Sequence, residues 1–161
     1  MAFLIGFPLF LGAQDLGTLR KKYPMASKDS LVAKELFVSL EQSAKRDALT
    51  LAYKGAIYTI RAKFTKPIKK KKSLVREGIA LLEQALENDG DNIEIRCLRL
   101  SVQEHLPKFI KYHGHIGEDK EFILAHFAEI TSKDLKAFLR EYVLQHSKVF
   151  NDSEKQLVRI P

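Results

Sequence analysis

The sequence predicts an all-α protein, an array of about seven helices paired into antiparallel hairpins. Apolar residues recur at steps of three and four along most of the chain, which places them on one face of a helix. No stretch shows the sustained alternation of apolar and polar residues that is typical of β-strands. With 161 residues, 45% hydrophobic and 29% charged, the chain is long enough to bury a core. Residues 15–161 are therefore expected to form a single helical domain.

The chain begins with an uninterrupted apolar run from Ala2 to Leu11. This run is too short to span a bilayer and has the length of the apolar core of a signal peptide. Ala13 offers a cleavage position, although no basic residue precedes the run and Leu11 stands where a small residue is preferred. Residues 1–14 are therefore expected to be a signal peptide that directs the protein to the periplasm. The alternative is a buried N-terminal helix in a cytoplasmic protein.

The next part of the chain predicts three helices. The first is expected to break at Pro24, and the second to begin with Ser27 as its N-cap. The third covers Asp47 to Phe64. Glycine inside a helix costs about 1 kcal/mol relative to alanine, so Gly55 in this helix and Gly78 in the next predict close contacts between helices.

A hairpin of two helices is predicted between Ser73 and Leu106, and the chain is expected to pack around it. Pro67 marks the start of its first helix, because proline is tolerated in a first helical turn. Gly90 is expected to close that helix in the left-handed conformation. Asp91, followed three residues later by Glu94, has the spacing of a capping box for the second helix.

The C-terminal third predicts a loop followed by three shorter helices. The loop comes after Pro107 and contains two glycines. Apolar stripes then predict helices over Glu118–Ile130 and Ser132–His146. Asn151, with Glu154 three residues on, predicts a second capping box and a last short helix.

The most basic segment, residues 61–76, holds eight basic residues and no acidic one. It has no aromatic residues spaced for base stacking and no reading helix, so nucleic acid is not expected as a partner. For an exported protein, an anionic lipid or an acidic polysaccharide is the corresponding target. The alternative is a solvated helix start whose lysines keep the protein soluble. The candidate anion-binding residues are Lys63, Lys66, Lys69, Lys70, Lys71, Lys72 and Arg76.

The sequence does not predict a metal site or another cofactor. The residues that could serve as ligands are His105, His113, His115, His126, Cys97, Glu118 and Asp119. The close pair, His113 and His115, is two residues apart in an apparent loop, whereas catalytic zinc motifs place paired histidines one helical turn apart. Exposed loop histidines are the simpler interpretation.

The sequence also does not predict an enzyme. Cys97 is the single cysteine, which excludes an intrachain disulfide, and its apolar neighbours indicate an inert buried thiol. His105 lies eight residues further on the same predicted helix, about 12 Å along its axis, too far for a direct hydrogen bond. No nucleophile elbow, P-loop or dinucleotide fingerprint is present.

The segment Glu77–Glu94 resembles the second helix and linker of a tetratricopeptide repeat, and Leu51–Ile60 resembles the first helix. The residues at the repeat's packing positions are Gly55, Tyr58, Gly78, Leu82 and Ala85. The match departs from the family in two ways. The two glycines are 23 residues apart, nearly double the repeat's spacing, and no second copy occurs at the 34-residue period.

Taken whole, the chain is similar to a family of small, exported, functionally uncharacterised helical proteins of Bacteroidetes-type bacteria. The stretches that carry this similarity are LAYKGAIYTIRAKF, NIEIRCLRLSVQEHLPKFIKYH, EDKEFIL and YVLQHSKVF. The resemblance implies a fold and an exported location, and it implies no activity.

The leading functional hypothesis is a non-enzymatic periplasmic protein that binds an unidentified protein partner or serves as a scaffold. Stacked helix pairs form a concave face that binds peptides or protein segments. The alternative is electrostatic binding of an anionic envelope component, a lipid or an acidic polysaccharide, through residues 61–76. The processed protein is not expected to span a membrane.

Overall fold

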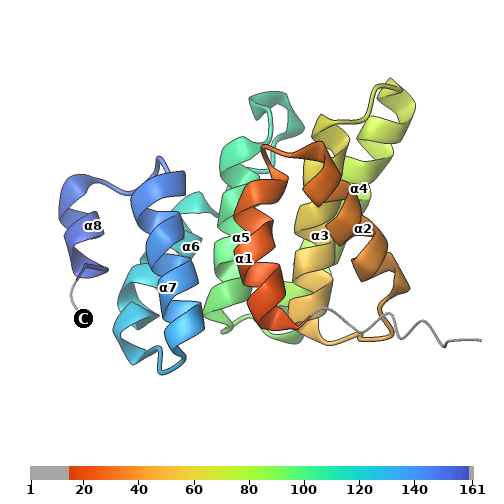
Figure 1. Cartoon of the computed structure of the whole chain (residues 1–161). Helices are drawn as coiled ribbons and strands as arrows, with labels where there is room; N and C mark the ends of the chain where they lie inside the picture. The colour runs from red at the N-terminus through yellow and green to blue at the C-terminus, as the bar shows by residue number, and fades with distance from the viewer. Residues whose placement is uncertain (1–14, 160–161) are drawn as a thin grey trace, which may run out of the picture.

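The computed structural model describes residues 15–159, and this part of the chain contains eight α-helices and no β-strand. The predicted all-α fold is therefore confirmed, whereas the predicted signal peptide, residues 1–14, lies outside the described residues. The helices, shown in Figure 1, are α1 (Leu16–Ala26), α2 (Ser30–Gln42), α3 (Ala48–Lys63), α4 (Ile68–Asn88), α5 (Ile93–His105), α6 (Ile116–His126), α7 (Lys133–Glu141) and α8 (Asp152–Leu157). Short 3₁₀ turns follow α5 and α6, and a π-helical turn extends α7 to His146.

Helices α1 to α5 run alternately up and down, so that each is antiparallel to the next (Figure 1). Helix α3 contacts α1, α2, α4 and α5. The C-terminal helices continue beyond α5, and α7 returns to contact α1. The rings of Tyr23 and Phe138 meet edge to face there, with their centroids 6.4 Å apart. The first and seventh helices are thus neighbours, although more than a hundred residues separate them in the sequence.

The most extensive contact between two helices joins α3 and α4. Gly55 and Gly78 face each other across this hairpin. A Cβ atom built on either glycine would lie 2.6 Å from the carbonyl oxygen of the other. The close approach predicted from these two glycines is therefore confirmed. The tetratricopeptide-like arrangement of the hairpin stays a prediction.

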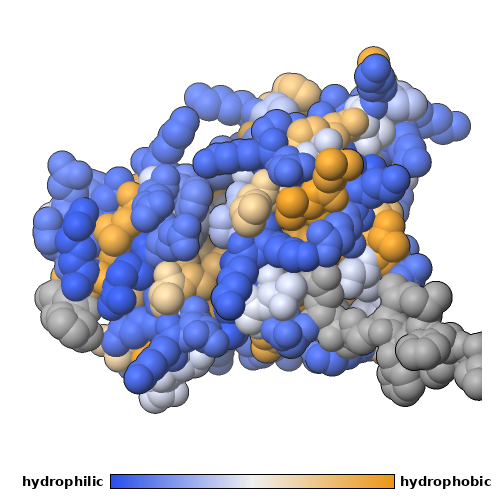
Figure 2. Space-filling model, viewed as in Figure 1, coloured by the Kyte–Doolittle hydropathy of each residue, from blue (hydrophilic) through white to orange (hydrophobic). Residues whose placement is uncertain are grey.

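Aliphatic side chains form most of the buried core. The largest apolar side chains with almost no exposed surface are Leu36, Tyr53, Ile57, Leu82, Ile95, Leu98, Leu100, Ile123, Leu139 and Val143. Hydrophilic side chains cover most of the face seen in Figure 2, while apolar atoms gather over α2.

The first two helices differ from the prediction at their shared turn. The break predicted at Pro24 is wrong, because α1 continues through Pro24 to Ala26. Proline inside a helix disfavours the helical turn around it. Ala26 is fully buried, and its packing stabilises this last turn of α1. The N-cap of α2 is Asp29 and not Ser27. Its carboxylate accepts hydrogen bonds from the backbone N–H groups of Leu31 and Val32.

The turn between α4 and α5 also differs. No glycine among the described residues has a positive φ, so Gly90 does not close α4 in the left-handed conformation. The capping box of Asp91 and Glu94 is wrong as well, since Asn92 caps α5. Glu94 cannot reach back to the cap because its carboxylate is turned into the core. The second predicted capping box, Asn151 with Glu154, is confirmed.

Candidate functional site

The basic stretch, residues 61–76, forms one end of the molecule. It comprises the last turn of α3, the connection and the first turns of α4, at the top of Figure 1. Counted from the facing Gly55 and Gly78, α3 runs eight residues and α4 ten residues to this end, so α4 reaches only slightly further than its partner. The four consecutive lysines from Lys69 to Lys72 cover all sides of a helical turn, and all four are exposed. The seven predicted anion-binding residues are all exposed.

The electrostatics of this end leave its positive charges uncompensated. Among the described residues, no carboxylate forms an ion pair with Lys66, Arg76 or the lysines from Lys69 to Lys72. The first turn of α4 has no acidic residue, and Pro67 at its N-cap supplies no side-chain hydrogen bond. Lysines are unfavourable at a helix N-terminus, where the helix dipole is positive. An anion bound there would relieve this repulsion.

Lys63 differs from the other six, because its ammonium group already has partners. Its Nζ donates a 2.8 Å hydrogen bond to the backbone carbonyl of Ser27 and lies 5.6 Å from the centre of the Phe64 ring. This bond ties the end of α3 to the turn between α1 and α2. Lys63 therefore helps to hold the basic end together and has less freedom to bind an anion.

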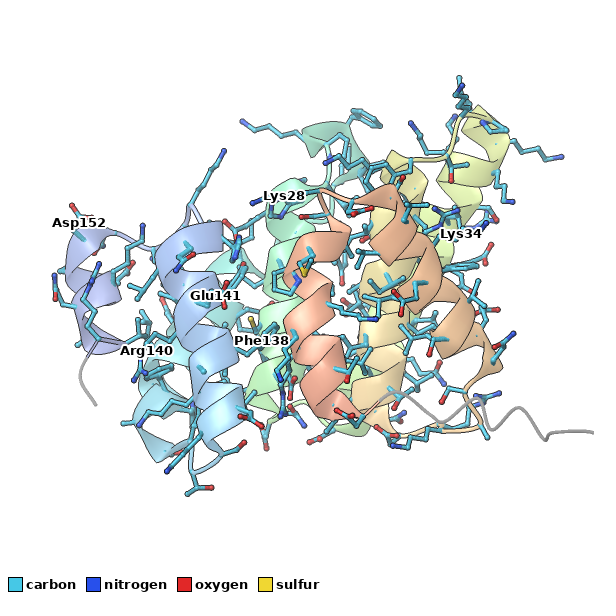
Figure 3. All side chains as sticks on the ribbon, viewed as in Figure 1. Lys28, Lys34, Phe138, Arg140, Glu141 and Asp152 are labelled. Carbon is cyan, nitrogen blue, oxygen red and sulfur yellow. The ribbon has the colours of Figure 1, made fainter. Side chains whose placement is uncertain are left out.

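Three further lysines, which sequence reasoning missed, lie at the same end. Lys28 lies in the turn between α1 and α2, where Figure 3 labels it. Lys108 and Lys111 lie in the segment after α5, which also reaches the top of Figure 1. All three are exposed. The up-and-down order of the helices brings the C-terminal ends of α1, α3 and α5 together, and this order could have predicted that the three lysines lie near residues 61–76. We call the surface formed by residues 61–76, Lys28, Lys108 and Lys111 the basic end.

The opposite end of the molecule carries several acidic residues. Asp15 and Asp47 cap the starts of α1 and α3, and Asp89 and Asp91 lie in the turn before α5. Backbone N–H hydrogen bonds at the caps are among the groups that lower the pKa of Asp15 and Asp47. Both carboxylates are therefore charged at neutral pH. Both signs of charge are present at this end, because Lys45 and Arg46 lie in the turn just before Asp47.

A buried ion pair links α1, α3 and α5. Glu94 is 1% exposed and accepts hydrogen bonds from Arg20, at 2.8 Å from Nε and 2.6 Å from Nη2. The hydroxyl of Tyr53 donates a 2.6 Å hydrogen bond to the same carboxylate. Burial and the Glu94 carboxylate raise the pKa of Tyr53 well above its usual range. These groups satisfy one another, and they hold the three helices in register.

A second buried cluster links α5 to α6. Asp119 has no exposed surface and accepts hydrogen bonds from Arg99, at 2.7 and 2.6 Å, and from Gln103 at 2.9 Å. Next to it, a hydrogen bond from Arg96 is the main cause that lowers the pKa of Glu118 to about 2. The apolar stripes of the sequence gave no signal for either cluster, because nothing in them specifies which charged residues turn inward.

The candidate chemical residues are separated in the structure. Cys97 is buried, and burial raises the pKa of its thiol well above the usual range, so little reactive thiolate exists at neutral pH. The ring nitrogens of His105 and His126 lie within hydrogen-bond distance of backbone carbonyls one turn earlier. Residues 15–159 contain no group of three histidine, cysteine or acidic side chains that could hold a metal ion.

Further observations concern membrane-spanning helices and similarity to known proteins. Within residues 15–159, each helix is too short or too polar to cross a bilayer. No family model matches the chain, so its resemblance to exported helical proteins of Bacteroidetes-type bacteria stays a prediction. A search of curated proteins and a search of solved structures likewise found no match to this chain.

Proposed function

We propose that this chain is a non-enzymatic binding protein whose basic end binds an anionic partner. The observation that supports the proposal is the start of α4, where exposed lysines have no carboxylate partner among the described residues. Lysines kept at the positive end of a helix dipole destabilise the free protein slightly. Binding of an anion would remove the repulsion between these lysines and the positive end of the helix dipole.

The expected affinity follows from the number of charges. A lysine close to an anionic surface contributes about 1 kcal/mol at physiological salt. Three lysines would then contribute about 3 kcal/mol, or roughly a hundredfold in affinity, as an upper value. The attraction must weaken as salt rises, because surface charges are screened over about 8 Å at physiological ionic strength.

The test compares two variants that carry the same net charge. The first replaces Lys70, Lys71 and Lys72 with glutamine. The control replaces Lys21, Lys45 and Lys133, three exposed lysines elsewhere on the protein. Binding to heparin and to vesicles that contain phosphatidylglycerol is measured over a salt titration.

We expect the first variant to lose at least about tenfold in affinity and the control to stay within about twofold. Equal losses in both variants would show that net charge alone governs binding. Wild-type protein that binds neither probe at low salt would refute the proposal.

A second candidate function is the binding of a protein partner, and the outer face of α2 favours it. Leu31 and Val38 are 75% and 40% exposed, and they lie two turns apart on one side of the helix. Crosslinking in envelope extracts should capture a partner with the wild type and lose it with Leu31→Ser and Val38→Ser. Recovery of no specific partner would count against this function.

We further propose that the protein is exported to the periplasm. The apolar run at the start of the chain supports this location. Mass spectrometry of the native protein's N-terminus tests it. Cleavage near Ala13 is the expected result, and an intact Met1 in the cytoplasmic fraction would refute it.

A further inference from the structure

The basic end also exposes large apolar side chains, which a purely electrostatic site does not need. Phe109 is 78% exposed, Ile68 is 69% exposed and Met25 is 54% exposed. These residues belong to the 3₁₀ turn after α5, the first turn of α4 and the last turn of α1. All three segments reach the same end of the molecule (Figure 1).

Each of these apolar residues has lysines close to it in the sequence. Lys108 and Lys111 flank Phe109, and Lys66 and Lys69 flank Ile68. This mixture is typical of surfaces that lie in the boundary between lipid headgroups and acyl chains. Apolar side chains enter the acyl region there, while the long lysine side chains reach back to the phosphates.

Phe109 is presented by an anchored turn. After the turn, the hydroxyl of Tyr112 donates a hydrogen bond to Glu83 on α4. Nε2 of His113 lies 3.0 Å from the carbonyl oxygen of Leu106, just before the turn. Lys111 takes the left-handed conformation, with φ of 55°, which L-residues other than glycine adopt at a cost. The turn is thus held from both sides with its phenylalanine in water.

We propose that the anionic partner of the basic end is a lipid bilayer, into which Phe109 and Ile68 insert while the surrounding lysines contact phosphate headgroups. This inference rests on the proposed function and specifies its partner. An acidic polysaccharide would use the lysines and leave the apolar residues in water. Only a bilayer offers anionic groups with an apolar layer directly beneath them.

The first test uses the absence of tryptophan from the sequence. In the full-length chain, Phe109→Trp creates a single tryptophan at the proposed insertion point, and Leu157→Trp places one at an exposed site on α8 as the control. Vesicles of phosphatidylglycerol and phosphatidylcholine are then added. We expect the emission of Phe109→Trp to shift to the blue and brominated lipids to quench it, with no such change for Leu157→Trp.

The second test measures affinity. Phe109→Ser with Ile68→Ser should lower the affinity for these vesicles by at least about tenfold, from the lost burial of two large apolar side chains. The same double variant should bind heparin as the wild type does. Leu157→Ser, which removes an exposed apolar residue on α8, should bind vesicles unchanged. All variants share residues 1–14, so any contribution of that apolar run is common to them.

The outcomes separate the two proposals. Binding to vesicles with unchanged Phe109→Trp emission, or equal affinity of the Phe109→Ser and Ile68→Ser double variant, would overturn insertion and leave electrostatic binding intact. Binding to heparin without binding to vesicles would point to a polysaccharide and overturn the lipid. No binding to either probe would overturn both proposals.

Discussion

Replacing Gly55 or Gly78 with alanine tests the contact between α3 and α4 directly. The new Cβ atom would lie 2.6 Å from the carbonyl oxygen of the opposite glycine, whereas ordinary contacts begin at 3.4 Å. The clashing atom belongs to the backbone of a helix, so no side-chain rotation can relieve it. The two helices would have to separate by about 0.8 Å at this point, which follows from the two distances.

The expected magnitude is the difference between two opposing effects. Forcing an extra carbon into a well-packed contact costs about 1–3 kcal/mol. Alanine is better than glycine inside a helix by about 1 kcal/mol, which offsets part of that cost. We therefore expect each substitution to lower the free energy of unfolding by up to about 2 kcal/mol. For a chain of this size, the midpoint of thermal unfolding should fall by up to about 8 °C.

Chemical denaturation followed by circular dichroism measures this loss. The matched control is Gly117→Ala in the first turn of α6, where a new Cβ would meet no atom within 4 Å. This control should leave the protein unchanged or stabilise it by up to about 1 kcal/mol. The difference in the free energy of unfolding between Gly117→Ala and Gly55→Ala then gives the cost of the clash without the helix preference of alanine.

The double variant provides a further test of the mechanism. Once the helices have separated for one methyl group, the second should meet less resistance. The loss in the variant with both Gly55→Ala and Gly78→Ala should therefore be smaller than the sum of the single losses. A Gly55→Ala variant as stable as Gly117→Ala would refute the reasoning.

Three more predictions concern buried and charged groups. Asp119→Asn should lower the free energy of unfolding by about 1.5–3 kcal/mol, measured in urea, because it replaces the charged partner that Arg99 contacts at 2.6 and 2.7 Å and leaves only Glu83 and Glu118, both at 3.7 Å; a loss below about 1 kcal/mol would contradict this. Iodoacetamide should modify Cys97 far more slowly in the native than in the unfolded protein, because its thiol is buried and its pKa is raised; equal rates would contradict burial. Folding lowers the pKa of Glu118 to about 2 from 4.5, chiefly through Arg96, so its contribution to stability is present above pH 4.5 and is lost as the pH falls toward 2. The melting temperatures of Glu118→Gln and wild type should therefore converge over that range, and a constant difference would contradict the linkage.

The sequence was sufficient to predict the fold class and some local features. The spacing of apolar residues predicted the helices, and the unfavourable Gly55 and Gly78 predicted a close helix contact. Asn151 and Glu154 predicted a cap correctly because both partners lie within three residues of each other. In each case the decisive interactions lie within a few residues or follow directly from a rule about one residue type.

Features that depend on distant residues were not predictable. Pro24 lies inside a helix because the buried Ala26 keeps the next turn packed. The N-cap of α5 is Asn92 and not the predicted Asp91, because the Glu94 carboxylate binds Arg20, 74 positions earlier. The same limit applies to the candidate site: residues 61–76 were visible as a basic run, but nothing local relates them to Lys28 or Lys108.

The contact between α1 and α7 bears on how the protein can evolve and unfold. In a linear stack of repeats, a terminal unit can be lost while the rest stays folded, because each unit depends on its nearest neighbours alone. Here removal of α7 would uncover Tyr23 and weaken α1, on which α2 and α3 also pack. The protein should consequently melt in one cooperative step, and a truncation that removes α1 or α7 should destabilise the whole domain.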